Sequence, residues 1–444
     1  MEKNNSIKFL EKYNLWYIQN KNSKATSCKD AAYKRKRLGS RGIPLYDELK
    51  SMAAKTKIDG EIVYVFAHCR ANAYLDLNKV SNVLGSTEIE RLSIDELKNN
   101  FNAEYGTVNP FQDNKTLVQI FDKDIFNFYT APHTLITNGG EFTISIEFNP
   151  SEIIKTLKKV NKKVLKTNII QEETKRKYDR SSIGIITGNG PDSGMFLWKQ
   201  INDRINDKLS KLGMHGGDLS YPRVIVNSIP EMGLSMELEA REDEVWNHLK
   251  EAVHTLCRSN IHYLTLACHT TQYFEEEIKL ICTQYNVIFY SMVDVVEEYI
   301  EKNNLKDLTV FAIPAVSNLG EYSAYGRLKK NKNIEVTSMK SEVEGEMQSL
   351  GYHIKTLKSG EKDPEAINRL RSLIKKGTNG ENALIALTEL SITLEKHESN
   401  KNKGKSKFNL IDGLQLYAEK MANVYLETLP RINENHEDEM WENC

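Results

Sequence analysis

The sequence predicts an α/β protein built from an N-terminal α+β domain and a C-terminal domain with parallel sheets. Its 444 residues are too many for one domain of ordinary size, which favours at least two. From residue 182 onward, apolar runs of strand length alternate with helical patterns, and this alternation is typical of parallel sheets covered by helices. Before residue 155 the strands and short helices lack that rhythm, which favours a separate α+β domain.

Composition and charge indicate an ordinary globular protein. Hydrophobic residues make up 40% and charged residues 27%, and the formal net charge is −1, so no global field attracts nucleic acid or a membrane. The six cysteines lack paired short spacings, which favours reduced thiols over a disulfide framework or a metal site. No stretch resembles a signal peptide or a membrane span. We therefore expect a cytoplasmic protein.

The N-terminal part shows clear local signals in order along the chain. Residues 61–68, "EIVYVFAH", are typical of a strand, and residues 76–85, "DLNKVSNVLG", of a short helix with an Asp cap and a terminal Gly. The turn signal "NGG" at 138–140 precedes "EFTISIEF" at 141–148, whose strict alternation predicts a half-exposed strand.

A basic segment follows this part. Residues 155–180 contain ten Lys or Arg, three acids and neither Gly nor Pro. Leu157, Val160, Val164 and Leu165 recur at helical spacing, so we expect an amphipathic helix across residues 155–181 that links the domains. Two interpretations of its charge stay open: a solvated connector, or a surface that contacts RNA phosphates.

Active sites of parallel α/β sheets lie at the carboxyl ends of the strands. The run "HYLTLAC" ends in Cys268, which His269, Thr270 and Thr271 follow directly. A lone cysteine after an apolar run is most often a packed core residue. Its position between a strand and a helix instead favours a functional thiol, because helix amino termini and nearby donors lower the pKa of a cysteine.

Three motifs in the C-terminal part resemble the cofactor-independent aspartate/glutamate racemase family. "IGIITGNGPDSG" (183–194) is similar to that family's opening strand and Gly-rich loop. "ACHTTQYF" (267–274) resembles its first cysteine motif, and "ALIALTELSITL" (383–394) its second. The resemblance extends over residues 182–430, including the last helix, "IDGLQLYAEKMANVYLETL".

The resemblance implies that Cys268 acts as base or nucleophile on an amino acid. A carboxylate or ammonium group of the substrate would then be held by the following residues: Asn189, Gly190, Asn227, His269, Thr270, Thr271 and Glu389. His269 could equally be a structural histidine, and Glu389 an acid that only stabilises a helix start. No cofactor and no metal are implied, and a homodimer is expected because the family commonly dimerises.

The second motif departs from the family pattern. Leu387 stands where the second cysteine belongs, and leucine carries no exchangeable proton. Three outcomes follow: Thr388 or a water donates from the second face and racemisation continues; Cys268 alone runs a one-sided reaction such as α-proton exchange with retention; or the pocket only binds an amino acid.

The N-terminal part, residues 25–155, resembles the YbaK/prolyl-tRNA editing family of aminoacyl-tRNA deacylases. The motifs are "AAKTKI" (53–58), the strand at 61–68, "GTVNPF" (106–111) and "LITNGGEFTISIEFNPSEI" (135–153). Lys55 aligns with the functional lysine, and Gly106 to Phe111 with the pocket loop, in which Asn109 replaces the usual Ser. Alternatively, Lys55 is a surface lysine on a helix.

These resemblances define the expected organisation and function. The expected parts are an editing-like domain (1–154), the linker (155–181), a racemase-like domain (182–432, with lobes 182–300 plus 408–430 and 305–405) and a tail (433–444). The leading hypothesis is a bifunctional enzyme, an amino-acid racemase or isomerase fused to a tRNA-editing domain, with an acidic amino acid and charged tRNA as partners and no membrane contact. The alternatives are a deacylase with a non-catalytic amino-acid binder, and a sensor in which both sites have decayed.

Overall fold

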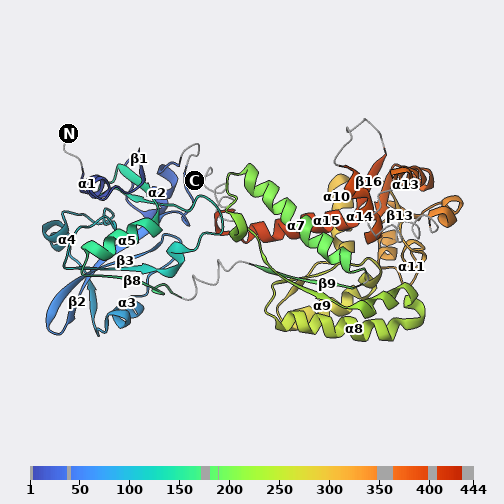
Figure 1. The fold of residues 1–444 in the computed structure, drawn as a ribbon, viewed down its shortest axis with the longest axis horizontal. Helices are drawn as coiled ribbons and strands as arrows, with labels where there is room; N and C mark the ends of the chain where they lie inside the picture. The colour runs from blue at the N-terminus through green and yellow to red at the C-terminus, as the bar shows by residue number, and fades with distance from the viewer. Residues whose placement is uncertain are drawn as a thin grey trace. The chain divides into compact units, whose positions relative to one another are not determined.

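The computed structural model describes residues 4–37, 42–171, 181–188, 190–347, 364–398 and 408–432 (Figure 1). The chain forms two compact units. The first contains Met1–Asp179, Leu209–Ser220 and Glu427–Cys444, and the second contains Arg180–Lys208 and Tyr221–Leu426. No helix in the described ranges is long and apolar enough to cross a bilayer.

The first unit contains two sheets. A mixed five-stranded sheet has the order β4-β2-β3-β5-β8, in which β3, β5 and β8 are parallel and β2 runs antiparallel to both of its neighbours. An antiparallel three-stranded sheet has the order β1-β7-β6. The strands are β1 (Tyr17–Lys21), β2 (Leu49–Ile58), β3 (Glu61–Arg70), β4 (Ile89–Arg91), β5 (Leu117–Asp122), β6 (Leu135–Asn138), β7 (Ile144–Phe148) and β8 (Lys163–Thr167).

The helices of the first unit begin and end at the polar residues expected from capping. In the helix predicted at 76–85, the Asp76 side chain accepts from the first-turn amides, and Gly85 ends the helix at φ 72°. The next helix carries a capping box between Ser93 and Glu96. The helices are α1 (Asn5–Lys12), α2 (Cys28–Lys34), α3 (Leu77–Leu84), α4 (Ile94–Phe101), the 3₁₀ helix η1 (Lys123–Phe126), α5 (Pro150–Val160) and the 3₁₀ helix η3 (Gly217–Ser220).

The predicted helix over residues 155–181 is wrong beyond Val160. Helix α5 ends there, Asn161 donates its backbone N–H to the Leu157 carbonyl, and residues 163–167 form strand β8 beside β5. Val164 and Leu165 fit a helical stripe equally well, but here they cover the edge of the five-stranded sheet. The helical spacing predicted a helix where a strand forms. Residues 163–167 become a strand because they pair with β5, which lies about 45 residues earlier in the sequence, and a local pattern does not record such a pairing. Residues 172–180 of the expected linker lie outside the described residues.

The strand predicted at 141–148 forms, but the expectation that it is half exposed is wrong. Ser145, Ile146, Glu147 and Phe148 of β7 are all buried, because β7 lies between β1 and β6. The polar residue Glu147 meets a protein partner instead of water, because its carboxylate accepts a hydrogen bond from Arg37 at 3.0 Å. The alternation of polar and apolar residues in β7 therefore distinguishes two faces of the strand that are both buried.

Arg431 is a buried part of the first unit, although it lies far along the chain. Its side chain is 2% exposed. Its guanidinium binds both carboxylate oxygens of Asp47, at 2.7–2.9 Å, and donates to the Thr130 carbonyl at 2.7 Å and the Pro132 carbonyl at 2.7 Å. Burial alone would raise the pKa of Asp47, but Arg431 and Arg37 outweigh burial and lower it. The first unit therefore includes this late segment of the chain.

The second unit contains two separate four-stranded parallel sheets, with orders β10-β9-β11-β12 and β14-β13-β15-β16. All neighbouring strands in both sheets are parallel, so this unit confirms the predicted α/β fold class. The strands are β9 (Ser182–Thr187), β10 (Arg223–Ser228), β11 (Tyr263–Leu266), β12 (Ile288–Phe289), β13 (Asp307–Phe311), β14 (Glu335–Ser338), β15 (Asn382–Ile385) and β16 (Asn409–Asp412).

Helices cover these sheets, and α8 and α9 lie together on one face of the first (Figure 1). The helices of the second unit are α7 (Pro191–Lys211), η4 (Pro230–Glu237), α8 (Leu238–Arg258), η5 (Thr270–Phe274), α9 (Glu275–Gln284), α10 (Met292–Asn303), α11 (Pro314–Ser317), η6 (Ala324–Lys330), α13 (Pro364–Gly377), α14 (Thr388–Glu398) and α15 (Gly413–Glu427), of which η4, η5 and η6 are 3₁₀.

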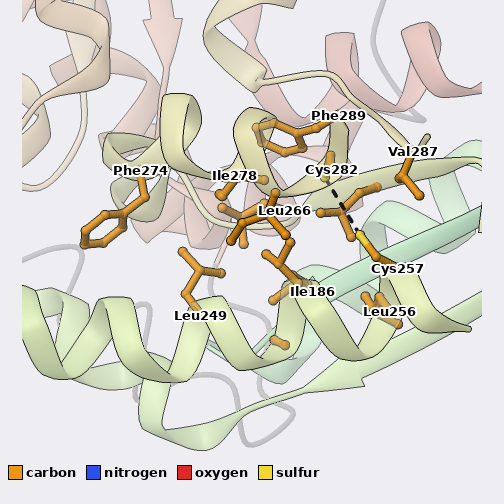
Figure 2. Packing of buried hydrophobic residues seen from close by; sticks show 14 of the residues in the cluster. Ile186, Leu249, Leu256, Cys257, Leu266, Phe274, Ile278, Cys282, Val287 and Phe289 are labelled. Carbon is orange, nitrogen blue, oxygen red and sulfur yellow. Dashed lines mark hydrogen bonds between the residues drawn. The ribbon is translucent and has the colours of Figure 1, made fainter. Parts of the chain in front are cut away.

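The hydrophobic core beneath α8 and α9 fixes the strand that leads to Cys268. Figure 2 shows Leu249 of α8, Ile278 of α9 and Leu266 of β11 packing together in this core. The thiols of Cys257 and Cys282 also lie in it, 4.0 Å apart and unlinked. Because β11 is buried on both sides up to Leu266, its carboxyl end is held in a fixed place.

Candidate functional site

The first unit contains a cavity of about 410 Å³ beside the amino-terminal half of β2. Its walls come from β2, the segment after β3, strand β4, helix α4 and the 105–108 loop. The lining residues are Lys50, Ser51, Met52, Ala53, Tyr74, Leu75, Leu77, Arg91, Leu97, Tyr105, Gly106, Val108 and Gln171. An apolar wall with a few polar groups is the usual form of a small-molecule site.

Lys50 is the lysine of β2 that lines this cavity. Its ammonium group donates to the Ala73 carbonyl and lies 5.0 Å from the centre of the Tyr74 ring. These contacts hold a positive charge at the cavity wall. Sequence reasoning missed Lys50, although the pair Lys50-Ser51 repeats the lysine-hydroxyl pattern of Lys55-Thr56 five residues earlier.

Lys55 is not among the residues that line the cavity. The cavity borders four consecutive residues of β2, 50–53, so Lys55 lies outside it because of its position further along the strand. The Lys55 ammonium group pairs with Glu96 at 2.6 Å and with Glu90 at 3.0 Å. Hydrogen bonds from Lys55 and Ser93 lower the pKa of the Glu96 carboxyl to about 2. Lys55 also lies on a strand, and the helix considered for it is absent here.

Of the two loop residues predicted for this site, Gly106 lines the cavity and Asn109 does not. Gly106 has φ 87°, and a Cβ there would lie 3.1 Å from the Phe142 ring, so glycine suits the position. Asn109 is 2% exposed and donates to Ser6 at 3.1 Å. It therefore ties the loop to the rest of the unit and does not face a ligand.

A chain of buried polar side chains begins at the cavity wall. Ser51 Oγ is 2.8 Å from His68 Nδ1, and His68 Nε2 is 2.9 Å from Gln119 Oε1. Gln119 Nε2 donates to the Pro110 carbonyl at 3.1 Å and to Asn161 Oδ1 at 2.7 Å. Burial lowers the pKa of His68 to about 3, so its ring is neutral near pH 7. Sequence reasoning did not identify this chain.

In the second unit, Cys268 lies where predicted, directly after β11 at the carboxyl edge of the first parallel sheet. Its side chain is 6% exposed. Gln272 holds the backbone here, because its amide donates to the Leu266 carbonyl and to the Cys268 carbonyl, each at 3.1 Å. The thiol is thus fixed between a strand and the 3₁₀ helix η5.

His269 brings the carboxyl edges of the two sheets of this unit together. A Cβ at Gly413, which follows β16, would lie only 2.8 Å from the His269 ring and 3.3 Å from the Ile385 carbonyl, which ends β15. His269 Nδ1 is 2.7 Å from the Tyr325 hydroxyl, whereas Nε2 is buried without a hydrogen-bond partner among the described residues. Burial lowers the pKa of His269 to about 3.

The two threonines after His269 are both buried, at 6% and 0% exposure for Thr270 and Thr271. Thr271 Oγ1 has no hydrogen-bond partner in the described part of the chain. Two unpartnered polar atoms therefore lie within three residues of the Cys268 thiol. Buried polar groups normally have partners, so a ligand or water is needed to satisfy them.

The second sheet presents Leu387 and Thr388 directly after β15. Leu387 packs against an apolar cluster, as its side chain requires. Thr388 is 5% exposed, and its hydroxyl donates to the Glu389 carboxylate at 3.0 Å. The predicted acid Thr388 is therefore already bonded to the predicted ammonium anchor Glu389.

Two of the three remaining predicted residues, Asn227 and Gly190, lie at the carboxyl edge of the first sheet. Asn227 of β10 is half-buried and pairs in register with Ile186. Gly190 follows the tight turn at Gly188, where a Cβ would lie 1.8 Å from the Ile229 carbonyl oxygen. Only glycine fits at 188, which explains the Gly-rich loop. Asn189 lies outside the described residues.

Comparisons with known proteins give one family match and several distant structural likenesses. Residues 27–156 match the family model of the aminoacyl-tRNA editing domain. No curated protein sequence matches the chain.

Among solved structures, a proposed Asp/Glu racemase from Yersinia pestis is 17% identical, with 55% of this chain and 99% of that chain covered and a TM-score of 0.44. An aspartate racemase homologue from Pyrococcus horikoshii is 20% identical, with the same coverage of 55% and 99% and a TM-score of 0.42.

A proposed trans-editing enzyme for prolyl-tRNA synthetase is 15% identical, with 38% of this chain and 99% of that chain covered and a TM-score of 0.30. Likenesses this distant assign no activity to the chain. The chain carries an N-terminal aminoacyl-tRNA editing domain, and its C-terminal half resembles aspartate and glutamate racemases in structure.

Proposed function

We propose that the first unit hydrolyses the ester bond of an aminoacyl-tRNA in the cavity beside β2. The observation that supports this most directly is the position of the cavity: all of its lining residues except Gln171 lie within the segment that matches the editing family. Water attacks the ester carbonyl, the bond to the ribose oxygen breaks, and the products are a free amino acid and an uncharged tRNA.

Lys50 is the side chain that suits this reaction best. Its ammonium group at the cavity wall can donate to the ester carbonyl, where negative charge develops, or to a phosphate of the terminal nucleotide. Gly106 brings the backbone of the 105–108 loop to the wall of the cavity. The cavity, about 410 Å³, suits a small amino acid with part of the terminal ribose.

The test is loss of labelled amino acid from a panel of charged tRNAs, measured with wild type and three single variants. Lys50→Ala should slow hydrolysis about 100-fold, as removal of an oxyanion donor does. Lys57→Ala is the matched control, since Lys57 is an exposed lysine of the same strand. Lys55→Ala separates the two assignments: if it abolishes activity while Lys50→Ala does not, the assignment to Lys50 is wrong. If wild type leaves every charged tRNA intact, the deacylase proposal fails.

We also propose that the second unit acts on a free acidic amino acid at Cys268. The unpartnered atoms His269 Nε2 and Thr271 Oγ1, in the segment that directly follows Cys268, support this second function, because a substrate carboxylate or ammonium group would satisfy them. Leu387 offers no proton from the second face, and the Thr388 hydroxyl is bonded to Glu389. A one-sided reaction, in which Cys268 removes the α-proton and returns it to the same face, therefore fits the site best.

Proton exchange in deuterated water tests this second proposal. One enantiomer of aspartate or glutamate, the one whose α-proton faces the thiol, should gain α-deuterium without inversion, and Cys268→Ala should abolish the uptake. Cys257→Ala is the control, because Cys257 is a buried thiol of the α8 core. Inversion of the α-carbon would show that a second acid acts, and no uptake with any amino acid would leave only ligand binding, measured by calorimetry.

A further inference from the structure

The chain of side chains that begins at Ser51 determines what the cavity can recognise. We propose that Ser51 is a fixed hydrogen-bond acceptor in the first unit's cavity, and that it selects a ligand carrying an uncharged hydroxyl group. The identity of the ligand in this inference rests on the proposed deacylase function. The role of Ser51 as an acceptor rests only on the hydrogen bonds of the structure. The argument follows the hydrogen bonds from the buried end of the chain to the cavity.

The buried end fixes the orientation of two side-chain amides. Asn161 Nδ2 donates to the carbonyls of Gln112, at 2.8 Å, and Asn114, at 3.0 Å. Both of its N–H groups are thereby used, so Asn161 Oδ1 is the acceptor for Gln119 Nε2. Gln119 donates its other N–H to the Pro110 carbonyl, which leaves Gln119 Oε1 as an acceptor.

These orientations determine which nitrogen of His68 carries the proton. Gln119 Oε1 can only accept, so His68 Nε2 must donate to it across 2.9 Å. In a neutral imidazole the other nitrogen then has a free lone pair. Because burial lowers the pKa of His68 to about 3, the neutral form persists through the physiological range. His68 Nδ1 is therefore an acceptor.

Ser51 is left with one role toward the cavity. Its hydroxyl hydrogen points to His68 Nδ1 at 2.8 Å, because that nitrogen needs a donor. The remaining lone pairs of the Ser51 oxygen can only accept. The same geometry argues against a nucleophilic serine: a histidine with so low a pKa is a poor base, and its partner Gln119 cannot neutralise an imidazolium ion.

The charges around the cavity favour a neutral donor over an ammonium group. Lys50 and Arg91 line the cavity, and no described lining residue carries a carboxylate. At Ser51, the protonated α-amino group that an aminoacyl ester also carries would meet two positive charges with no compensating acid. A hydroxyl group can donate to Ser51 without this repulsion. In an aminoacyl-tRNA, that hydroxyl belongs either to the terminal ribose or to the side chain of the amino acid.

Four substrates separate the two sources of the hydroxyl group. The tRNA is charged with serine or alanine and ends in adenosine or 2′-deoxyadenosine, so each pair differs by one hydroxyl. We expect Ser51→Ala to lower kcat/KM about 5- to 10-fold for the member of a pair that carries the recognised hydroxyl, and to leave its partner unchanged. Ser51→Thr keeps an oxygen at this position and should restore the wild-type difference in kcat/KM between the two members of the pair.

Equal effects of Ser51→Ala on all four substrates, or no effect on any, would overturn the inference. A covalent aminoacyl-protein trapped by rapid quenching of wild type, with the aminoacyl group mapped to Ser51, would do so as well, because it would identify Ser51 as a nucleophile. Circular dichroism and thermal unfolding establish that each variant is folded.

A second measurement is independent of hydrolysis. In full-length protein labelled with ¹⁵N-histidine, the signals of His68, assigned by their loss in His68→Leu, should show a protonated Nε2 and an unprotonated Nδ1 from pH 5 to pH 8. A protonated Nδ1 would refute the inference, since the Ser51 hydroxyl would then be free to donate to the cavity.

If wild type hydrolyses no charged tRNA, the deacylase proposal fails and binding decides the role of Ser51. The probes are the stable amides 3′-serylamino- and 3′-alanylamino-adenosine with their 2′-deoxy forms. A preference for one hydroxyl that Ser51→Ala removes supports the acceptor role, and equal binding of all four contradicts it.

Discussion

His68 in the first unit and His269 in the second differ in one decisive respect. Both rings are almost fully buried, and burial lowers the pKa of each to about 3. His68 uses both nitrogens, toward Ser51 and Gln119, whereas His269 uses only Nδ1, toward Tyr325. Burial of the same side chain therefore produces a completed network at one candidate site and an incomplete one at the other. The first is ready to present an acceptor, and the second needs a ligand or water to be satisfied.

Acid should produce the largest effect on both histidines. Their folded pKa values lie below the unfolded value of about 6.5, so their contribution to stability is present above that value and is lost as the pH falls. Between pH 7 and pH 5 each loses about 2 kcal/mol of folding free energy. Hydrogen exchange should show the loss separately in β3 for His68 and after β11 for His269. In a variant with leucine at one of the two positions, the loss of folding free energy between pH 7 and pH 5 should be about half of that in wild type. A pH dependence of stability that is the same in the variant and in wild type would contradict the low pKa of that histidine.

At pH 7, replacement of each histidine by leucine should lower the free energy of unfolding by different amounts. His68→Leu leaves the buried Gln119 oxygen without a donor, and we expect a loss of about 3 kcal/mol. His269→Leu removes the unpartnered Nε2 and leaves only the Tyr325 hydroxyl unsatisfied, so about 1 kcal/mol should be lost. Urea unfolding of the two variants measures the difference. Equal losses would mean that the missing partner of His269 has no energetic consequence.

Ligand binding should sharpen the comparison further, with an effect that depends on concentration. If an acidic amino acid satisfies His269 Nε2, it should stabilise the second unit by about 2.7 kcal/mol at 100 times its Kd. Its effect on the first unit should be absent. Thermal unfolding with aspartate, glutamate and their mirror images measures this, and His269→Leu is the matched variant. Stabilisation that persists in His269→Leu would place the ligand elsewhere.

Tyr325→Phe should have the smallest effect. The change removes the only described hydrogen-bond partner of His269 Nδ1 and leaves a single neutral bond unmade, worth about 1 kcal/mol. The phenol itself is fully buried, which raises its pKa, so it acts as a neutral group in this bond. Urea unfolding at pH 7 gives the value, and a loss above about 3 kcal/mol would indicate that Tyr325 also supports the packing of η6.

The sequence predicted those parts that depend on local signals. Asp76 and Gly85 delimit α3 as expected, and the rule for parallel sheets placed Cys268 at a carboxyl edge. The Gly-rich loop also follows local chemistry, because Gly188 lies where no Cβ fits.

Features that depend on pairing between distant strands could not be read in this way. The helical stripe after residue 160 gave no sign that Lys163–Thr167 pairs with β5. The choice between Lys50 and Lys55 requires knowing which part of β2 borders the cavity. Likewise, Ser51 and His68 meet only through the register of β2 and β3, and no local pattern records that register.

Arg431 has a practical consequence for dissecting the protein. A clone that ends at residue 171 would contain every residue of the cavity, yet it would omit the guanidinium that pairs with Asp47. The carboxylate of Asp47 would then be left buried with only Arg37 beside it. Sequence-guided excision of the editing domain is thus expected to yield an unstable fragment. Activity assays on this domain should therefore begin with the full chain.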